Sequence, residues 1–194
     1  MARPRVHTDE LRETLLIRTA EAVAARGAAA VSLREVATAA ETSTTAVYSL
    51  FGNKEALLQA VLVRAFEQFA QAQEEVPVTE DPVADILGLG AAYVAWALDH
   101  PAWYSVMFGG PLIGITRREE VEGVADRAMT PLRSAVERGL GAGRLREAAP
   151  ETIAVSLWAQ VHGLSTLALT GHLPPEVDLA TAALADVQGW IAAG

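Results

Sequence analysis

Residues 32–54 carry a cluster of hydroxyl, phenol and basic side chains that are suited to binding a ligand through hydrogen bonds and charge. Serine and threonine hydroxyls bond phosphate oxygens or base edges, a tyrosine or lysine reaches a phosphate, and a small alanine allows close approach. The side chains of this kind are Ser32, Arg34, Thr42, Ser43, Thr44, Thr45, Ala46, Tyr48, Ser49 and Lys54. Together they form a candidate nucleic-acid-binding set.

Two short helices must position this set. Ser32 and Glu35 form a Ser-x-x-Glu capping box that satisfies the free amides at the start of a helix. Apolar residues then recur at i, i+3, i+4 and i+7, which gives this helix one apolar stripe. That stripe consists of Leu33, Val36, Ala37 and Ala40.

The second helix begins after an interruption at residues 41–42, with Ser43 as its N-cap. Ala46, Val47 and Phe51 can face inward, which leaves the hydroxyl residues among 44–49 on the outer face. Two short helices joined by a tight turn form the helix-turn-helix plan, whose second helix enters the major groove of DNA. An ordinary helical hairpin with a polar outer face fits the same periodicity.

Flanking helices complete a three-helix head. The pattern predicts a helix over residues 8–26, with Thr8 as its N-cap and Gly27 at its end. Residues 1–7 are expected to be disordered without DNA, and their two arginines resemble basic arms that touch backbone or minor groove. After the head, Asn53 is the predicted N-cap of a long helix over residues 53–75, with Lys54 in its first turn.

Residues 32–58 resemble the N-terminal DNA-binding segment of the TetR family of transcriptional regulators. The positions that match the family pattern are Ala37, Ser43, Val47, Tyr48, Phe51, Lys54, Glu55 and Leu57. The sequence departs from that pattern at Glu41-Thr42, where Gly-Val is usual, and at Thr45, where glycine is common. Glu41 lacks the tolerance of glycine for positive φ, and its charge lies near the expected phosphates. The resemblance implies a DNA-binding regulator.

The charge distribution fits a separate DNA-binding head. The chain of 194 residues has a net charge of −9. Residues 1–54 hold seven basic and six acidic residues, whereas the remainder holds eight and eighteen. The near-neutral head predicts a shallow dependence of DNA affinity on salt. The absence of cysteine, and of an apolar run after the basic N-terminus, predicts a cytoplasmic protein without a signal peptide.

The remaining sequence predicts a helical body. Pro82 is expected at the first position of a helix over residues 82–99, which is apolar nearly all round. Further helices are predicted over residues 102–108, 117–139, 150–172 and 176–193, with a loop at 112–116 and a kink or break at Pro131. The helix from residue 150 has too many polar groups for a membrane span. The predicted fold is therefore all-α with about nine helices: an N-terminal three-helix helix-turn-helix head, residues 1–52, and a C-terminal helical bundle, residues 53–194, connected by helix 53–75.

The segment Trp158 to Leu164 resembles the Trp…His-Gly signature of one TetR C-terminal class. That resemblance implies a small-molecule effector site, for which the aromatic, methionine and histidine residues of the body are candidates. These candidates are Tyr93, Trp96, Trp103, Met107, Phe108, Trp158 and His162. Each aromatic residue also fits an ordinary core position, and His162 equally fits a core histidine bonded to a carbonyl. The last two helices are expected to pair with those of a second copy in a homodimer.

Catalytic, metal-binding and cofactor-binding patterns are absent from the sequence. The four histidines show no ligand spacing, and there is no phosphate-binding glycine loop or nucleophile elbow. We therefore expect a DNA-binding transcriptional regulator that is no enzyme, most simply a ligand-released repressor that binds a palindromic operator as a homodimer. An activator, or a regulator without a ligand, has the same sequence features. A helical small-molecule-binding protein whose head lacks DNA affinity is the alternative from another class.

Overall fold

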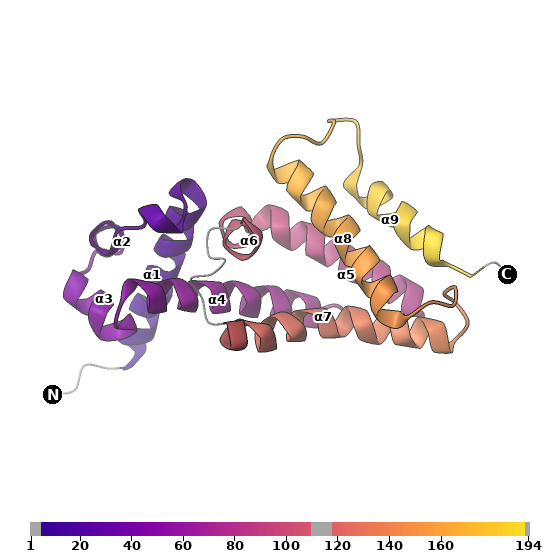
Figure 1. Cartoon of the computed structure of the whole chain (residues 1–194), viewed down its shortest axis with the longest axis horizontal. Helices are drawn as coiled ribbons and strands as arrows, with labels where there is room; N and C mark the ends of the chain where they lie inside the picture. The colour runs from indigo at the N-terminus through magenta and orange to yellow at the C-terminus, as the bar shows by residue number, and fades with distance from the viewer. Residues whose placement is uncertain (1–4, 110–117, 193–194) are drawn as a thin grey trace. The chain divides into compact units, whose positions relative to one another are not determined.

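The computed structural model describes residues 5–109 and 118–192, which are helical apart from turns, loops and one isolated β-bridge. Within these residues there are nine α-helices and one short 3-10 helix (Figure 1). Their bounds are α1 Arg5–Arg26, η1 Ala28–Ala30, α2 Leu33–Ala39, α3 Thr44–Phe51, α4 Lys54–Glu74, α5 Pro82–Asp99, α6 Pro101–Phe108, α7 Arg118–Gly141, α8 Pro150–Leu169 and α9 Leu179–Trp190. The predicted all-α fold is confirmed.

The chain divides into two compact units. The first contains residues 1–67 and 100–124, and the second contains residues 68–99 and 125–194. The continuous helices α4 and α7 each contribute to both units. The proposed domain division at residues 52 and 53 stays a prediction.

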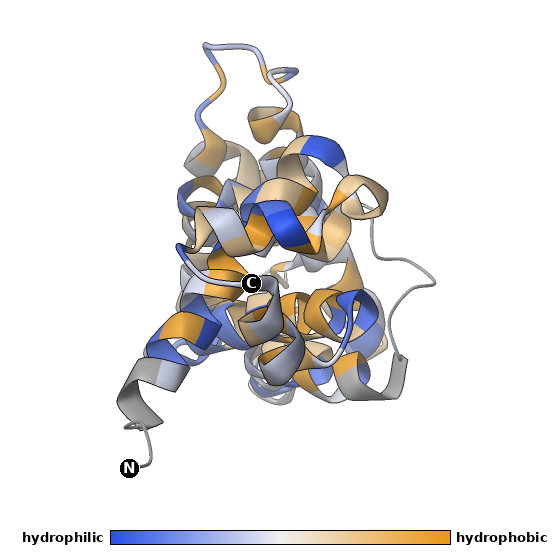
Figure 2. Cartoon of the chain, turned by 90° about the vertical axis from the view of Figure 1, so that its left-hand side faces the viewer, coloured by the Kyte–Doolittle hydropathy of each residue, from blue (hydrophilic) through white to orange (hydrophobic). Residues whose placement is uncertain are grey.

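The core of the first unit is aliphatic. In this unit α1 packs against α2, η1 and α6, and α2 packs against α3. The helices alternate hydrophilic and hydrophobic positions along their length, as amphipathic periodicity requires (Figure 2). Their inward positions are fully buried at Leu15, Leu16, Val23, Val36, Val47, Leu57, Leu58 and Val61. Val47 anchors α3 in this core, and the opposite face of α3 is exposed to solvent.

In the second unit, α5, α8 and α9 pack against one another, with α8 and α9 side by side (Figure 1). Their core cluster includes Ile86, Leu89, Val136, Ile153 and Leu157. The end of α9 is tied back by two backbone hydrogen bonds, from the Arg146 amide to the Trp190 carbonyl at 2.8 Å and from the Ala192 amide to the Arg144 carbonyl at 3.0 Å.

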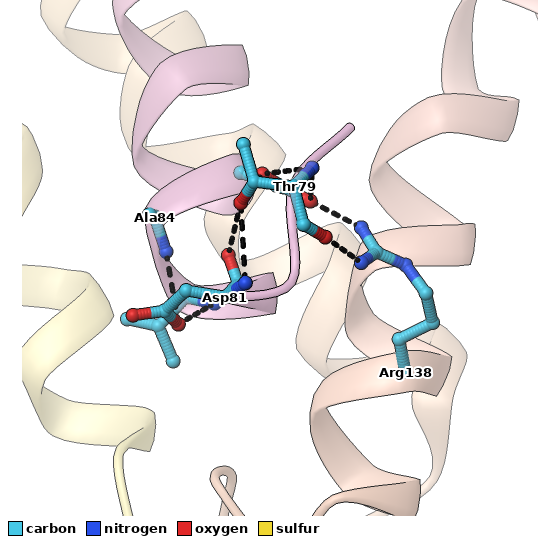
Figure 3. A network of polar contacts seen from close by, with 6 residues as sticks. Thr79, Asp81, Ala84 and Arg138 are labelled. Carbon is cyan, nitrogen blue, oxygen red and sulfur yellow. Dashed lines mark hydrogen bonds and ion pairs between the residues drawn. The ribbon is translucent and has the colours of Figure 1, made fainter. Parts of the chain in front are cut away.

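A buried carboxylate fixes the loop between α4 and α5 in the second unit. The Asp85 carboxylate accepts hydrogen bonds from the Thr79 amide at 3.0 Å and from the Thr79 hydroxyl at 2.7 Å, and it forms an ion pair with Arg138 of α7. Arg138 also donates to the Thr79 carbonyl at 2.9 Å, while Asp81 caps α5 through the amides of Val83 and Ala84 (Figure 3). Hydrogen bonding from Arg138, and then from Thr79, lowers the pKa of Asp85.

Several helix bounds differ from those predicted. Helix α1 begins at Arg5, so Thr8 is not its N-cap and residues 5–7 are helical, whereas residues 1–4 lie outside the described part. The prediction at Pro131 was a kink or a break; helix α7 continues through this residue, so there is no break, and the kink stays a prediction. Helix α9 begins at Leu179 because the Asp178 carboxylate accepts from the Thr181 amide at 2.9 Å and caps the helix there. Helix α5 has the predicted bounds, and the predicted loop at 112–116 lies outside the described residues.

Helices α5 and α8 are long and apolar enough, by composition alone, to cross a membrane. The protein buries 50% of the apolar window of α5 and 28% of that of α8. Two such helices are weak evidence of a membrane span, since core helices meet the same criteria.

Candidate functional site

Helix α2 is joined to the end of α1 through its first turn. The Ser32 hydroxyl accepts from the Glu35 amide at 3.5 Å, which is the N-cap half of the predicted capping box. The Glu35 carboxylate accepts from the Arg26 guanidinium at 2.8 Å. The Ser32 hydroxyl is therefore used within the fold, whereas Arg34 of the same helix has an exposed side chain.

The turn between α2 and α3 has the hydrogen bonds of a Schellman motif. The Thr42 amide donates to the Ala37 carbonyl at 2.9 Å, and the Glu41 amide donates to the Thr38 carbonyl at 3.1 Å. Glu41 has a φ of 51° and is the only non-glycine residue with positive φ in the described part of the chain. This left-handed position explains why a glycine suits it better than a glutamate.

Replacing Glu41 with glycine should stabilise the protein by about 0.5–1 kcal/mol in urea unfolding. The change removes a left-handed penalty of roughly 1–2 kcal/mol for an L-residue, less about 0.4–1 kcal/mol for the greater freedom of glycine in the unfolded chain. It also removes an exposed negative charge, so DNA binding in a gel shift should tighten by about 3-fold. Glu41→Gln is the matched control: it should tighten binding equally without the gain in stability. Equal stabilisation by both variants would contradict the strain argument.

Helix α3 presents a narrow polar stripe to solvent. The Ser43 hydroxyl accepts from the Ala46 amide at 3.1 Å, which confirms Ser43 as the N-cap. Thr45, Tyr48 and Ser49 are exposed at i, i+3 and i+4, and Tyr48 retains 54% of its accessible surface. Thr44, expected on the outer face, is half-buried. Thr45, Tyr48 and Ser49 are called the α3 stripe below.

An open groove of about 630 Å³ lies along one side of α3, within the first unit. Four predicted contact residues line it, namely Thr42, Ser43, Ala46 and Ser49. Thr8 and Leu11 of α1 and Glu41 also line it. The motif could not reveal the α1 residues, because they lie some thirty positions earlier and only the tertiary fold brings them to the groove.

The first turn of α4 is hydrogen-bonded to other parts of the head. The Asn53 side chain accepts from the Ala56 amide at 2.8 Å, which confirms Asn53 as the N-cap. The Lys54 ammonium donates to the carbonyl of Ala29 in η1 at 2.9 Å. Lys54 therefore stabilises the head directly. Only the N–H groups of its ammonium that do not bond Ala29 are left to donate to a phosphate.

Four of the predicted effector-site residues lie in the second unit and are connected there. The Tyr93 hydroxyl lies 3.0 Å from Nδ1 of His162, and the rings of Trp158 and His162 are 6.0 Å apart. Phe69 of α4 packs edge-on against Tyr93 and Trp96, with centroid distances of 5.0 and 5.1 Å. Burial lowers the pKa of His162, so this imidazole is neutral at pH 7.

The other three predicted effector-site residues, Trp103, Met107 and Phe108, lie on α6 in the first unit. Trp103 is buried, and Phe108 packs against Phe66 with ring centroids 6.1 Å apart. The structure thus divides the predicted set between two units.

A small cavity of about 40 Å³ lies inside the second unit. Tyr93 and Trp158, both predicted, line it together with residues that the sequence analysis missed, namely Phe69, Gln73, Met129 and Gln160. Gln73 continues the apolar stripe of α4 at i+4 from Phe69. A polar residue on an otherwise apolar stripe was the feature of the sequence that could have identified Gln73 as a cavity residue.

The chain matches two families of known sequences. Residues 15–61 match bacterial regulatory proteins of the tetR family, and residues 86–188, more than half of the chain, match the tetracyclin repressor-like C-terminal domain. An HTH-type transcriptional regulator of Mycobacterium tuberculosis is 29% identical over 126 residues, which are 62% of this chain and 53% of that protein. The chain thus spans about half the length of the curated relatives it matches.

Solved structures share the whole fold. A TetR family regulator from Marinobacter aquaeolei has a TM-score of 0.82 at 20% identity, covering 97% of this chain and 99% of that one. A protein of unknown function from Rhodococcus sp. RHA1 has a TM-score of 0.76 at 26% identity, covering 93% and 95%. AibR, solved in complex with isovaleryl coenzyme A and operator DNA, has a TM-score of 0.72 at 17% identity, covering 93% and 97%. From the two family matches, the chain belongs to the TetR family of helix-turn-helix transcriptional regulators, which are not enzymes.

Proposed function

We propose that the protein is a repressor that binds a palindromic operator as a homodimer in the cytoplasm and is released by a small-molecule ligand. The observation that carries the DNA-binding proposal is the α3 stripe. Val47 is buried beneath it and Ser43 caps the helix, so Thr45, Tyr48 and Ser49 are held outward by a rigid support. Hydroxyls on the exposed face of a second helix suit the major groove.

The homodimer proposal rests on the outer face of α8. Val155, Ala159, Gly163 and Leu167 recur at i, i+4, i+8 and i+12, and Val155 and Leu167 are among the exposed large hydrophobic residues. A Cβ at Gly163 would meet no neighbour within 4 Å, so the surface is open there. An apolar stripe with small central residues allows two copies of a helix to approach closely around a two-fold axis. Trp158, His162 and Gly163 also support placing this region in the Trp-His-Gly class.

Ligand release is proposed to act through α4. This one helix carries Asn53 and Lys54 at its DNA-proximal end, and Phe69 and Gln73 on the cavity wall. A ligand that favours a different position of α4 disfavours the head geometry that DNA requires. A coupling of about 1–3 kcal/mol changes operator affinity by roughly 5–150-fold. AibR, a protein of this fold, was solved with both a small molecule and operator DNA.

Selection from random DNA tests the proposed operator. The wild-type chain should enrich a palindrome with half-sites about one helical turn, or a multiple of it, apart, and the same preparation should sediment as a dimer. Thr45→Ala should alter the preferred bases, whereas Lys54→Ala should lower affinity by about 3–10-fold on every sequence and leave the preference unchanged. Enrichment of no sequence, or a new preferred site with Lys54→Ala, would contradict the assignment of these roles.

The alternative, a small-molecule-binding protein without DNA affinity, is favoured by two observations. Glu41 places an exposed carboxylate in the groove beside α3, and the Lys54 ammonium is engaged with Ala29. Failure of the wild-type chain to bind any pool of duplex DNA, together with ligand binding to the free protein, would favour this alternative. An activator differs from a repressor only in the transcription measured from the enriched site.

A further inference from the structure

The cavity of the second unit is walled almost entirely by apolar groups. Aliphatic and aromatic side chains come from the second half of α4 and from α5, α7, α8 and α9, among them Phe69, Leu89, Leu132 and Val161. None of the described residues that line it carries a formal charge. A buried ionised group without a partner carries a large desolvation penalty, so the cavity disfavours a charged occupant.

Gln73 supplies one unused polar group to this wall. Its side chain is 5% exposed, and its Nε2 atom has no hydrogen-bond partner within the described structure. A buried amide donor left unpaired is destabilising, because it has lost its hydrogen bonds to water. Three other lining residues carry N–H or O–H groups, and each has a partner: Gln160 Nε2 donates to the Ala182 carbonyl at 3.3 Å, the Tyr93 hydroxyl contacts His162, and Trp158 also makes interactions of its own. Gln73 is therefore the available donor.

We propose that the cavity binds a small, uncharged, mainly apolar ligand whose hydrogen-bond acceptor, such as a carbonyl or ether oxygen, accepts from Nε2 of Gln73. This inference rests on the proposed ligand-released function and specifies the chemical class of the ligand. An anionic ligand would find no cation among the lining residues, and the nearby His162 is neutral because burial lowers its pKa.

The size of the cavity limits the ligand further. Its volume of about 40 Å³ is far below the roughly 300–1,000 Å³ typical of sites for drug-sized ligands. A ligand must therefore displace wall side chains as it enters. Met129 is suited to this because its unbranched thioether adapts to irregular shapes. Displacement of the wall is also how occupancy would be transmitted to α4, which carries Phe69 and Gln73.

A matched pair of probes tests the hydrogen bond. Cyclopentanone and methylenecyclopentane have nearly the same shape, but only the ketone has an acceptor. Calorimetric titration of the full-length protein should show the ketone binding about 5-fold more tightly than the alkene, as expected for one neutral hydrogen bond of roughly 1 kcal/mol. Gln73→Met, which keeps the side-chain length, should reverse the preference. Gln71→Met on the exposed face of the same helix should preserve it.

Each other outcome decides against the proposal. If the wild type binds neither probe, or prefers the alkene, Gln73 does not donate a hydrogen bond to a ligand and the proposal is overturned. If Gln73→Met retains the preference for the ketone, the acceptor is recognised elsewhere. The wild-type preference is decisive even if the variant is unstable. DNA affinity measured without probes tests the proposed function separately: intact DNA binding with no probe bound would overturn only the cavity assignment, and probe binding without DNA binding would overturn only the repressor.

Discussion

Replacing Arg138 with methionine should lower the free energy of unfolding by about 3 kcal/mol at pH 7. The carboxylate of Asp85 is only 4% exposed, and the substitution removes its ion pair while leaving the charge buried. Breaking a buried pair from one side costs roughly 3–5 kcal/mol. We expect the low end because the Arg138 side chain is 34% exposed and the Thr79 hydrogen bonds remain. Urea unfolding measures the change.

The loss should depend on pH in a defined direction. The pKa of Asp85 is lowered in the folded protein, first by Arg138 and then by Thr79. A lowered carboxyl pKa contributes stability above the unfolded value of about 3.9, and this contribution disappears as the pH falls through the folded value. The difference in stability between wild type and Arg138→Met should therefore be full at pH 7 and shrink below about pH 4.

Arg133 offers a matched control on the same helix. Its side chain is 33% exposed, nearly the same as that of Arg138, and it also pairs with carboxylates. Those partners, Asp126 and Glu151, are 66% and 60% exposed, so Arg133→Met should cost less than about 1 kcal/mol. Equal losses for the two variants, or a loss at Arg138 that does not change with pH, would show that the burial of Asp85 is not the cause.

Local chemistry made much of this fold predictable from sequence. The N-caps Ser32, Ser43, Asn53 and Asp81 each satisfy amides within three residues, so their roles are visible in a short window. Helix α5 was predicted from Pro82 to Asp99 because proline starts it and His100-Pro101 follows it. The apolar pattern predicts a start of α9 at Glu176, whereas the Asp178 carboxylate caps the helix and it starts at Leu179.

The candidate sites were less predictable, because they depend on which distant segments meet. Aromatic identity suggested both Trp158 and Trp103 for one pocket, but it contains no information about which unit each residue joins. Lys54 follows the family pattern for a phosphate contact. Its hydrogen bond to the Ala29 carbonyl could not be predicted, because that bond depends on the position of η1 in the fold. Gln73 was overlooked because a single glutamine on an amphipathic helix is ordinary until its burial is known.

Replacing Tyr48 with glutamate should reduce operator affinity by at least about 100-fold while leaving the fold intact. The change removes the proposed phosphate contact of Tyr48 and introduces a negative charge where phosphates are expected, and roughly 3 kcal/mol in total corresponds to about 100-fold. Because Tyr48 is 54% exposed on the α3 stripe, its substitution should alter the free energy of unfolding by no more than about 0.5 kcal/mol. Gel shifts with the enriched palindrome and urea unfolding measure the two quantities.

Ala24→Glu is the control for charge alone. Ala24 is exposed on α1 of the same head, so this variant adds the same negative charge away from the α3 stripe. Its affinity should fall by no more than about 3-fold, because solvent and salt screen an exposed charge that is not part of the proposed contact surface, over a distance of about 10 Å. The proposed homodimer would carry each substitution twice, which enlarges the expected difference in affinity between the two variants. If the folded Tyr48→Glu protein bound the operator as tightly as Ala24→Glu, the DNA-reading surface would have to lie on a face other than that of α3.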